Sequence, residues 1–282
     1  MLVLISTYNF KVNLKMEKNT KTTLLIIGNL VSIVAVIIVN ALASILPLNG
    51  MDTGALSDMI PNLFVPAGIT FSIWGLIYTF FLIFAGYNIY VLIKKKEEDV
   101  EAINRVGIWF ILSSVGNFVW IFLWHWQLVF ISLFFMLLIL GSLIVIYVRL
   151  GIGKREVTWK ERVTTHITFS FYLGWITVAT IANIVAVLVT QGLVPTFSAI
   201  LPEATWTIIV IAAAAVISMI NTFTRKDLAY NAVIIWALAG IIIKRVSVVP
   251  LETGIVIATS ISIAAIVLAT IIKWSYYFYK RN

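Results

Sequence analysis

The feature that most constrains this chain is a set of long apolar runs that contain no charged residue. The longest run extends from Val106 to Val148 and has no Asp, Glu, Lys or Arg. As one helix it would be about 64 Å long at about 1.5 Å per residue, roughly twice the thickness of the hydrocarbon core of a bilayer. We therefore expect two antiparallel helices that turn near residues 124–127, where Trp-His-Trp-Gln interrupts the aliphatic sequence.

Composition extends this argument to the whole chain of 282 residues, of which 61% are hydrophobic and 11% are charged. Soluble domains have about 45–50% apolar and about 25% charged residues, so this chain has too few polar side chains to cover an aqueous surface. Each span in lipid needs a helix of about 20 apolar residues, because lipid cannot satisfy exposed backbone groups. Eight uncharged runs meet or approach this length: 23–46, 66–93, 107–125, 127–148, 163–190, 204–223, 228–243 and 253–272. The expected fold class is an all-α polytopic membrane helix bundle of about eight spans.

These spans divide the chain into four expected parts. They are a cytoplasmic N-terminal segment (1–22), a five-span core (23–191), three additional spans (192–274) and a cytoplasmic tail (275–282). Residues 1–15 are given no structural role, because Met16 offers a second start and the segment lacks the order of a signal peptide. The run at 228–243 is the shortest of the eight spans.

The distribution of basic residues predicts how the spans are oriented. With eight spans, 18 of the 20 Lys and Arg residues fall on the side of both termini, and only Lys244 and Arg245 fall on the other side. Cytoplasmic loops of membrane proteins are enriched in Lys and Arg, so both termini are expected in the cytoplasm, in a multi-pass protein of the cell membrane that contacts lipid. The net charge of +8 lies in short clusters between apolar runs, which argues against a nucleic-acid partner. The loop 47–62 has two Asp and no basic residue and is expected outside.

Most catalytic chemistry finds no suitable residues in this chain. There is no Cys, and the two histidines, His125 and His166, lie in no metal-binding motif. The predicted spans contain no Asp, Glu, Lys or Arg, whereas proton relays and ion-coupled carriers usually place such residues within the membrane. The serines in the spans lie in no G-x-S-x-G elbow. We therefore expect a protein that is not an enzyme and that requires no metal or cofactor.

What remains within the membrane is a set of aromatic and amide side chains. They recur at helical spacing in the second, third and fifth spans and are Trp74, Tyr78, Asn117, Trp120, Trp124, Tyr172, Trp175 and Asn183. Within each span the spacing places them on one face, and most of them converge on the outer half of the bilayer. Such side chains can bond neighbouring helices to one another or line a pocket for an apolar ligand, and periodicity alone leaves both interpretations open.

Three short motifs contain these residues. Residues 65–78 read VPAGITFSIWGLIY, residues 117–120 read NFVW, and residues 172–175 read YLGW with Asn183 eight residues later. In this order and on these spans, they resemble the TspO/MBR family of tryptophan-rich sensory proteins and translocator proteins. The resemblance covers about residues 24–191.

The resemblance implies a five-helix membrane bundle, often dimeric, with a pocket for tetrapyrroles such as protoporphyrin and for other lipophilic molecules. It assigns Trp74, Asn117, Trp120, Trp175 and Asn183 to pocket-associated positions and makes the loop 47–62 the lid. The expected function is then a membrane sensor or binding protein for tetrapyrrole-like or other lipophilic ligands, with a homodimer as a candidate assembly. Indole faces stack on a flat macrocycle, and a few amides orient its polar edge.

The sequence also departs from the pattern of the family. Gly68 replaces a second tryptophan, Val65 replaces one of two prolines, and Phe171 replaces the proline before Y-L-x-W. The segment 184–188 lacks the aromatic and basic residues linked to sterol contact, so sterols are the least supported ligands.

The last three spans have no counterpart in the five-span core of the family. Small residues at 212–215, Gly240 and Gly254 would allow close helix packing, either on the core or on a second copy. A membrane carrier of a small lipophilic or neutral molecule, with these spans completing its path, is the alternative function. A third class, an enzyme that acts on the bound ligand, is expected least because no acid–base group or metal site serves it.

Overall fold

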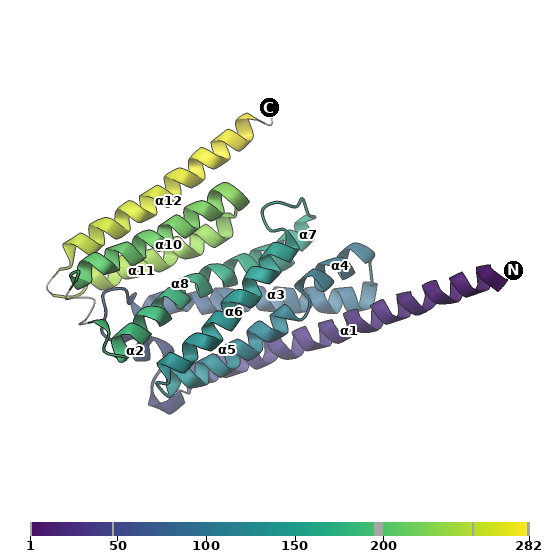
Figure 1. Ribbon diagram of the computed structural model, residues 1–282, viewed down its shortest axis with the longest axis horizontal. Helices are drawn as coiled ribbons and strands as arrows, with labels where there is room; N and C mark the ends of the chain where they lie inside the picture. The colour runs from purple at the N-terminus through teal and green to yellow at the C-terminus, as the bar shows by residue number, and fades with distance from the viewer. Residues whose placement is uncertain (1, 47, 195–199, 250, 281–282) are drawn as a thin grey trace.

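The computed structural model describes residues 2–46, 48–194, 200–249 and 251–280, with side chains from residue 19 onward except that of residue 278. All regular elements of the described chain are helices, and it contains no strand. The eight longest helices among the described residues are α1 (Leu2–Ile45), α3 (Ile73–Lys94), α5 (Trp109–His125), α6 (Val129–Leu150), α8 (Thr168–Thr190), α10 (Glu203–Arg225), α11 (Leu228–Val246) and α12 (Thr253–Tyr279). The predicted all-α polytopic bundle is confirmed (Figure 1).

Seven helices among the described residues are long and apolar enough to cross a membrane. An eighth span arises if α5, which has 17 residues, is joined to α4 (Glu97–Val106), from which it is bent by 41°. The seventh span, expected to be short, extends to Val246 and has 19 residues. The eight runs of the sequence thus correspond to eight helices, one of which begins at a bend.

Two segments differ from the expectation. Helix α4 forms between the second and third predicted spans, where the sequence analysis predicts no helix; its first turn is acidic, and Val100, Ile103 and Val106 are buried on one face. Helix α1 has 44 residues and begins at Leu2, so it includes the segment to which no structural role was given. In Figure 1 its first turns extend beyond the other helices.

The helices form two groups that pack side by side. Helices α1, α3, α5, α6 and α8 pack together as the first group. Helices α10, α11 and α12 form the second group, which contacts the first mainly where α11 packs on α8. Helix α11 lies against α8 at Gly174, where an added Cβ would be 3.0 Å from Cβ of Val233. Of the small residues expected at helix contacts, Gly240 and Ala214 are closely packed, whereas Gly254 has no atom near its Cβ position.

Both termini lie at the same end of the bundle, together with α4 and the short helix α7 (Trp159–Glu161) (Figure 1). The opposite end carries α2 (Thr53–Asp58) and the turn between α5 and α6. The chain is therefore a multi-pass membrane protein whose basic loops share one end. The assignment of that end to the cytoplasm stays a prediction.

Candidate ligand-binding site

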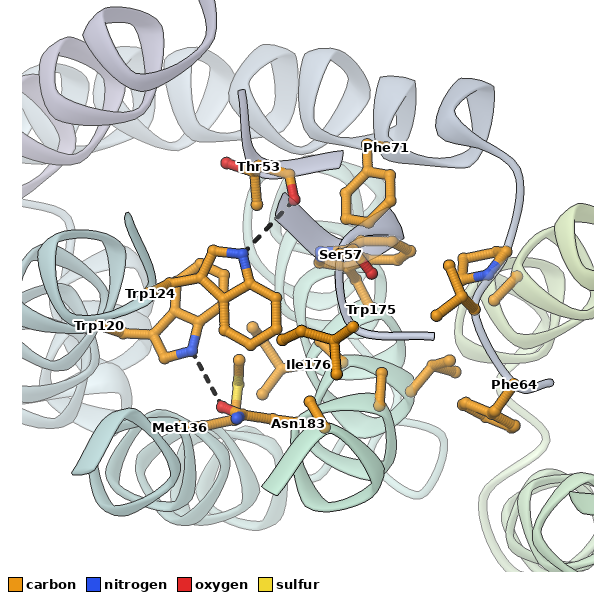
Figure 2. A pocket seen from close by; sticks show the side chains of 18 of the residues that line it. Thr53, Ser57, Phe64, Phe71, Trp120, Trp124, Met136, Trp175, Ile176 and Asn183 are labelled. Carbon is orange, nitrogen blue, oxygen red and sulfur yellow. Dashed lines mark hydrogen bonds between the residues drawn. The ribbon is translucent and has the colours of Figure 1, made fainter. Parts of the chain in front are cut away.

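A cavity lies at the end of the bundle that is opposite to the termini, between α3, α5, α6, α8, α11 and the segment around α2. The cavity has a volume of about 60 Å³, and its walls are mostly apolar. Figure 2 shows its aromatic, aliphatic and amide side chains converging on a common space. The cavity therefore has the character of a small-molecule site, in which a few polar groups interrupt an apolar lining.

Trp120 and Trp124 of α5 form one wall of the cavity. Their rings stack with centroids 5.7 Å apart and planes at 21°, as the i, i+4 spacing on a helix allows. The indole Nε1 of Trp120 donates to Oδ1 of Asn183 at 3.1 Å, and that of Trp124 donates to the backbone oxygen of Thr53 at 3.4 Å (Figure 2). Both indoles are thus fixed by a hydrogen bond at one edge.

Trp74 and Trp175 form the facing wall, with Phe71 beside them. Trp175 meets Trp74 edge to face at 6.2 Å and meets Phe71 in the same way at 5.8 Å. Behind Trp74 lie Tyr78, whose ring stacks on it at 5.5 Å, and the fully buried Tyr172 at 6.2 Å. Edge-to-face and offset pairs of this kind are favourable for aromatic rings, so Tyr78 and Tyr172 hold Trp74 in place.

Asn117 supplies the cavity with a polar group that the protein does not use. Its side chain is fully buried, and its Oδ1 accepts a hydrogen bond from Nδ2 of Asn40 at 2.7 Å. Its own Nδ2 has no acceptor among the described residues. A buried amide without a partner costs about 1–3 kcal/mol, which a ligand with an acceptor atom would offset.

Six of the eight side chains selected from the sequence line this cavity. They are Trp74, Asn117, Trp120, Trp124, Trp175 and Asn183. Tyr78 and Tyr172 do not line it and lie behind Trp74. That these eight residues bind a ligand stays a prediction, but their convergence is a property of the structure.

Sequence reasoning missed most of the aliphatic lining. Met136 of α6 and Ala237 and Ile241 of α11 carry no motif and were not selected. The segment from α2 to the start of α3 contributes eight further residues: Thr53, Ser57, Ile60, Asn62, Phe64, Val65, Pro66 and Phe71. The resemblance indicates only the part up to residue 62 as a lid, and it includes Val65, Pro66 and Phe71 in a motif without assigning them to the pocket.

Comparison with known families identifies the chain. A family model described as TSPO-like protein matches residues 25–274. The chain belongs to the TSPO-like protein family. No curated protein and no solved structure matches it. The family match continues through α10, α11 and α12, beyond the 24–191 region over which the motifs were recognised.

The segment 48–62 of this TSPO-like chain, which we call the lid, lies at the cavity, and its role as a lid stays a prediction. Asp52 caps α2 by accepting hydrogen bonds from two backbone N–H groups through Oδ1, at 2.8 and 2.9 Å. Asn49 donates to the backbone oxygen of His125 at 2.9 Å, and Trp124 donates to that of Thr53. The lid is therefore fastened to the end of α5 by two hydrogen bonds.

Helix α11 closes the other side of the cavity and holds the chain that follows the lid. The backbone N–H of Ala67 donates to the oxygen of Gly240 at 2.9 Å, and the indole of Trp236 donates to the oxygen of Thr70 at 2.9 Å. Lys244 forms an ion pair with Asp58 of α2 at 2.9 Å. Helix α11 thus completes the pocket as well as packing on the core.

The cavity lining is neutral among the described residues. The walls offer indole faces, aliphatic groups and amides, and the lining contains no Asp, Glu, Lys, Arg or His. In the part of the chain that the structure describes, no group of three or more His, Asp and Glu residues could hold a metal ion.

Proposed function

We propose that this TSPO-like chain is a membrane sensor or binding protein for flat, lipophilic molecules of the tetrapyrrole class or similar shape. The observation that carries the proposal is the apolar cavity with indoles on two facing walls and one unused amide donor, Nδ2 of Asn117. Indole faces stack on a conjugated macrocycle, and the amide would orient a carbonyl, carboxylate or ring-nitrogen acceptor. The proposal involves binding alone and no chemical step on the ligand.

The size of the cavity sets a condition on the ligand. Pockets that enclose drug-sized molecules have volumes of about 300–1,000 Å³, whereas this cavity has a volume of about 60 Å³. A macrocycle therefore requires α2 to move outward. This movement would break the hydrogen bonds of Asn49 and Thr53 and a partly exposed ion pair to Lys244, and it would expose Leu56 of α2, which is buried.

The test is a titration of the purified full chain in detergent micelles with protoporphyrin, followed by the absorbance of the porphyrin and by tryptophan fluorescence. Trp120→Ala removes half of the stacked indole pair and should weaken binding by roughly tenfold, since loss of a central aromatic contact costs about 2 kcal/mol or somewhat less. Trp159→Ala is the matched control, because Trp159 is 73% exposed and lies at the other end of the bundle. Equal affinities of both variants and the wild type, with the fold intact, would refute the proposed pocket.

The carrier alternative has its own measurement. Accumulation of porphyrin inside proteoliposomes beyond the amount bound at equilibrium would favour a carrier. Retention limited to one bound equivalent would favour a sensor or binding protein.

A further inference from the structure

A second cavity lies at the end of the bundle that carries the termini, and it shares no lining residue with the aromatic pocket. This second cavity has a volume of about 730 Å³. Its walls come from the loop 152–157, the π-helical turn η3 (Arg162–Ile167), the turn 226–229 between α10 and α11, and two aromatic residues of α12, Trp274 and Tyr277. It therefore lies where the two groups of helices meet.

Cationic side chains dominate this cavity. Lys154, Arg155, Arg162 and Lys226 line it. The guanidinium of Arg155 is paired with Glu161. The other three cations form no ion pair with a carboxylate among the described residues, so their charge is available to a ligand.

The two carboxylates in the lining do not neutralise these cations. Asp227 is occupied by the fold: its Oδ2 accepts from the hydroxyls of Tyr147 and Ser170 at 2.9 and 2.6 Å, and its Oδ1 accepts from two backbone N–H groups at the start of α11. Burial raises the pKa of Asp227 above its ordinary value. Glu156 is exposed and forms no ion pair with the other lining residues among those described.

His166 adds a buried polar group to the same wall. It is 6% exposed and its Nε2 makes no hydrogen bond within the described chain; the nearest carboxylate oxygen, Oε1 of Glu161, is 4.0 Å away. Both Arg162 and His166 belong to η3, and π-helical turns occur frequently at functional sites.

The remaining walls indicate what carries the anionic group. Nζ of Lys226 lies 4.0 Å from the centre of the Tyr277 ring, and Leu228 beside it is 48% exposed. Trp and Tyr are typical of the membrane–water interface, and basic cavities between spans on the cytoplasmic side bind lipid headgroups. A free phosphate ion has no apolar part that could contact these aromatic and aliphatic side chains, whereas a phospholipid has acyl chains.

We propose that this cavity binds the phosphate of an anionic phospholipid headgroup through Lys154, Arg162 and Lys226, with the acyl chains leaving along Leu228 and the aromatic residues of α12. Arg and Lys are the side chains best suited to phosphate, and their charge-assisted hydrogen bonds are about twice as strong as neutral ones. This site is independent of the aromatic pocket and of the function proposed for it.

The test compares lipids retained by the full chain. Protein is taken from nanodiscs of equimolar phosphatidylglycerol and phosphatidylcholine, and bound lipid is counted by native mass spectrometry. Wild type should retain phosphatidylglycerol preferentially. Arg162→Gln with Lys226→Gln should weaken this retention by at least about tenfold, because two charge-assisted contacts to the phosphate are lost. Lys94→Gln with Lys96→Gln removes two exposed charges outside the cavity and should change retention less than about twofold.

Three results would overturn the proposal. They are equal retention of both lipids by the wild type, equal loss in both double variants, and binding of glycerol 3-phosphate as tight as that of the lipid, which would assign the site to a soluble phosphate. If the cavity double variant does not fold, Lys154→Gln takes its place, since Lys154 is exposed. An unchanged melting temperature and an unchanged helical circular dichroism spectrum of each variant show that the rest of the protein is intact.

Discussion

The contact between α11 and the chain after the lid offers the sharpest test of how the pocket is closed. A Cβ added at Gly240 would lie 2.0 Å from Oγ1, 2.8 Å from Cγ2 and 2.9 Å from Cβ of Thr70. Cβ atoms do not approach other heavy atoms this closely, so Gly240→Ala must displace one of the two segments. Thr70 is buried and β-branched, and its χ1 has few alternatives.

The expected cost follows from three contributions. Overpacking of this kind costs about 1–3 kcal/mol, whereas alanine gains about 1 kcal/mol over glycine within a helix. Separation of the segments also weakens the hydrogen bonds from Ala67 to Gly240 and from Trp236 to Thr70, each worth about 0.5–1.5 kcal/mol. We expect a net loss of about 1–3 kcal/mol and a melting temperature lower by several degrees.

Two assays check this prediction on the purified protein in detergent micelles. Thermal unfolding should show the lower melting temperature, and porphyrin titration should show weaker binding, because Phe71, Ala237 and Ile241 on the two displaced segments line the pocket. Gly75→Ala is the control: no atom lies within 4 Å of its Cβ position, so it should be neutral or stabilising by up to about 1 kcal/mol.

A second substitution makes the test specific. Thr70→Ala removes Oγ1 and Cγ2, and Oγ1 has no hydrogen-bond partner among the described residues that would be lost. The double variant should therefore recover most of the stability lost by Gly240→Ala, and the cycle should show coupling of about 0.5–3 kcal/mol. Additive effects, or a Gly240→Ala protein with the melting temperature and affinity of the wild type, would refute the view that α11 closes the pocket.

Two further substitutions test the polar contacts of the fold. Asp227→Ala leaves the hydroxyls of Tyr147 and Ser170 and two backbone N–H groups without their acceptor, and it should lower stability by about 1–3 kcal/mol; an unchanged melting temperature would contradict this role. Lys244→Gln breaks the ion pair to Asp58, whose side chain is 43% exposed, so stability should change by less than about 1 kcal/mol, and a larger shift in the melting temperature would show that the pair is more than a surface contact.

Hydropathy predicted the spans well because lipid imposes one rule on every segment. A charged residue or a broken helix is costly in lipid, so length and the absence of charge almost define a span. The hydropathy rule does not predict helix α4, because its polar residues resemble those of a loop. Its amphipathic pattern, with Glu97, Glu98 and Asp99 in the first turn and buried Val100 and Ile103, carries a signal that a search for short helices would detect.

The candidate site could be predicted only where a side chain was unusual for its surroundings. Asn117 and Trp120 stand out in an aliphatic helix, and both line the cavity. Periodicity places Tyr172 on the same face as Trp175, but it gives a direction and not a depth, and Tyr172 lies behind the lining. Ile241 is one of many aliphatic residues, and only the tertiary packing of α11 brings it to the pocket.

The position of α11 also bears on how the chain is divided into units. Aromatic residues of α5 and α8 line the cavity together with Ala237 and Ile241 of α11. These two α11 residues come after the expected boundary between residues 191 and 192. The chain that follows the lid is hydrogen-bonded to α11 through Ala67 and Thr70, and Leu63 N–H donates to Glu203 of α10 at 3.2 Å. A fragment that ended near residue 191 would therefore open one side of the pocket to lipid and release the chain that precedes α3. We therefore expect ligand binding in the pocket to depend on α11, although the last three helices contribute none of the motifs by which the pocket was recognised.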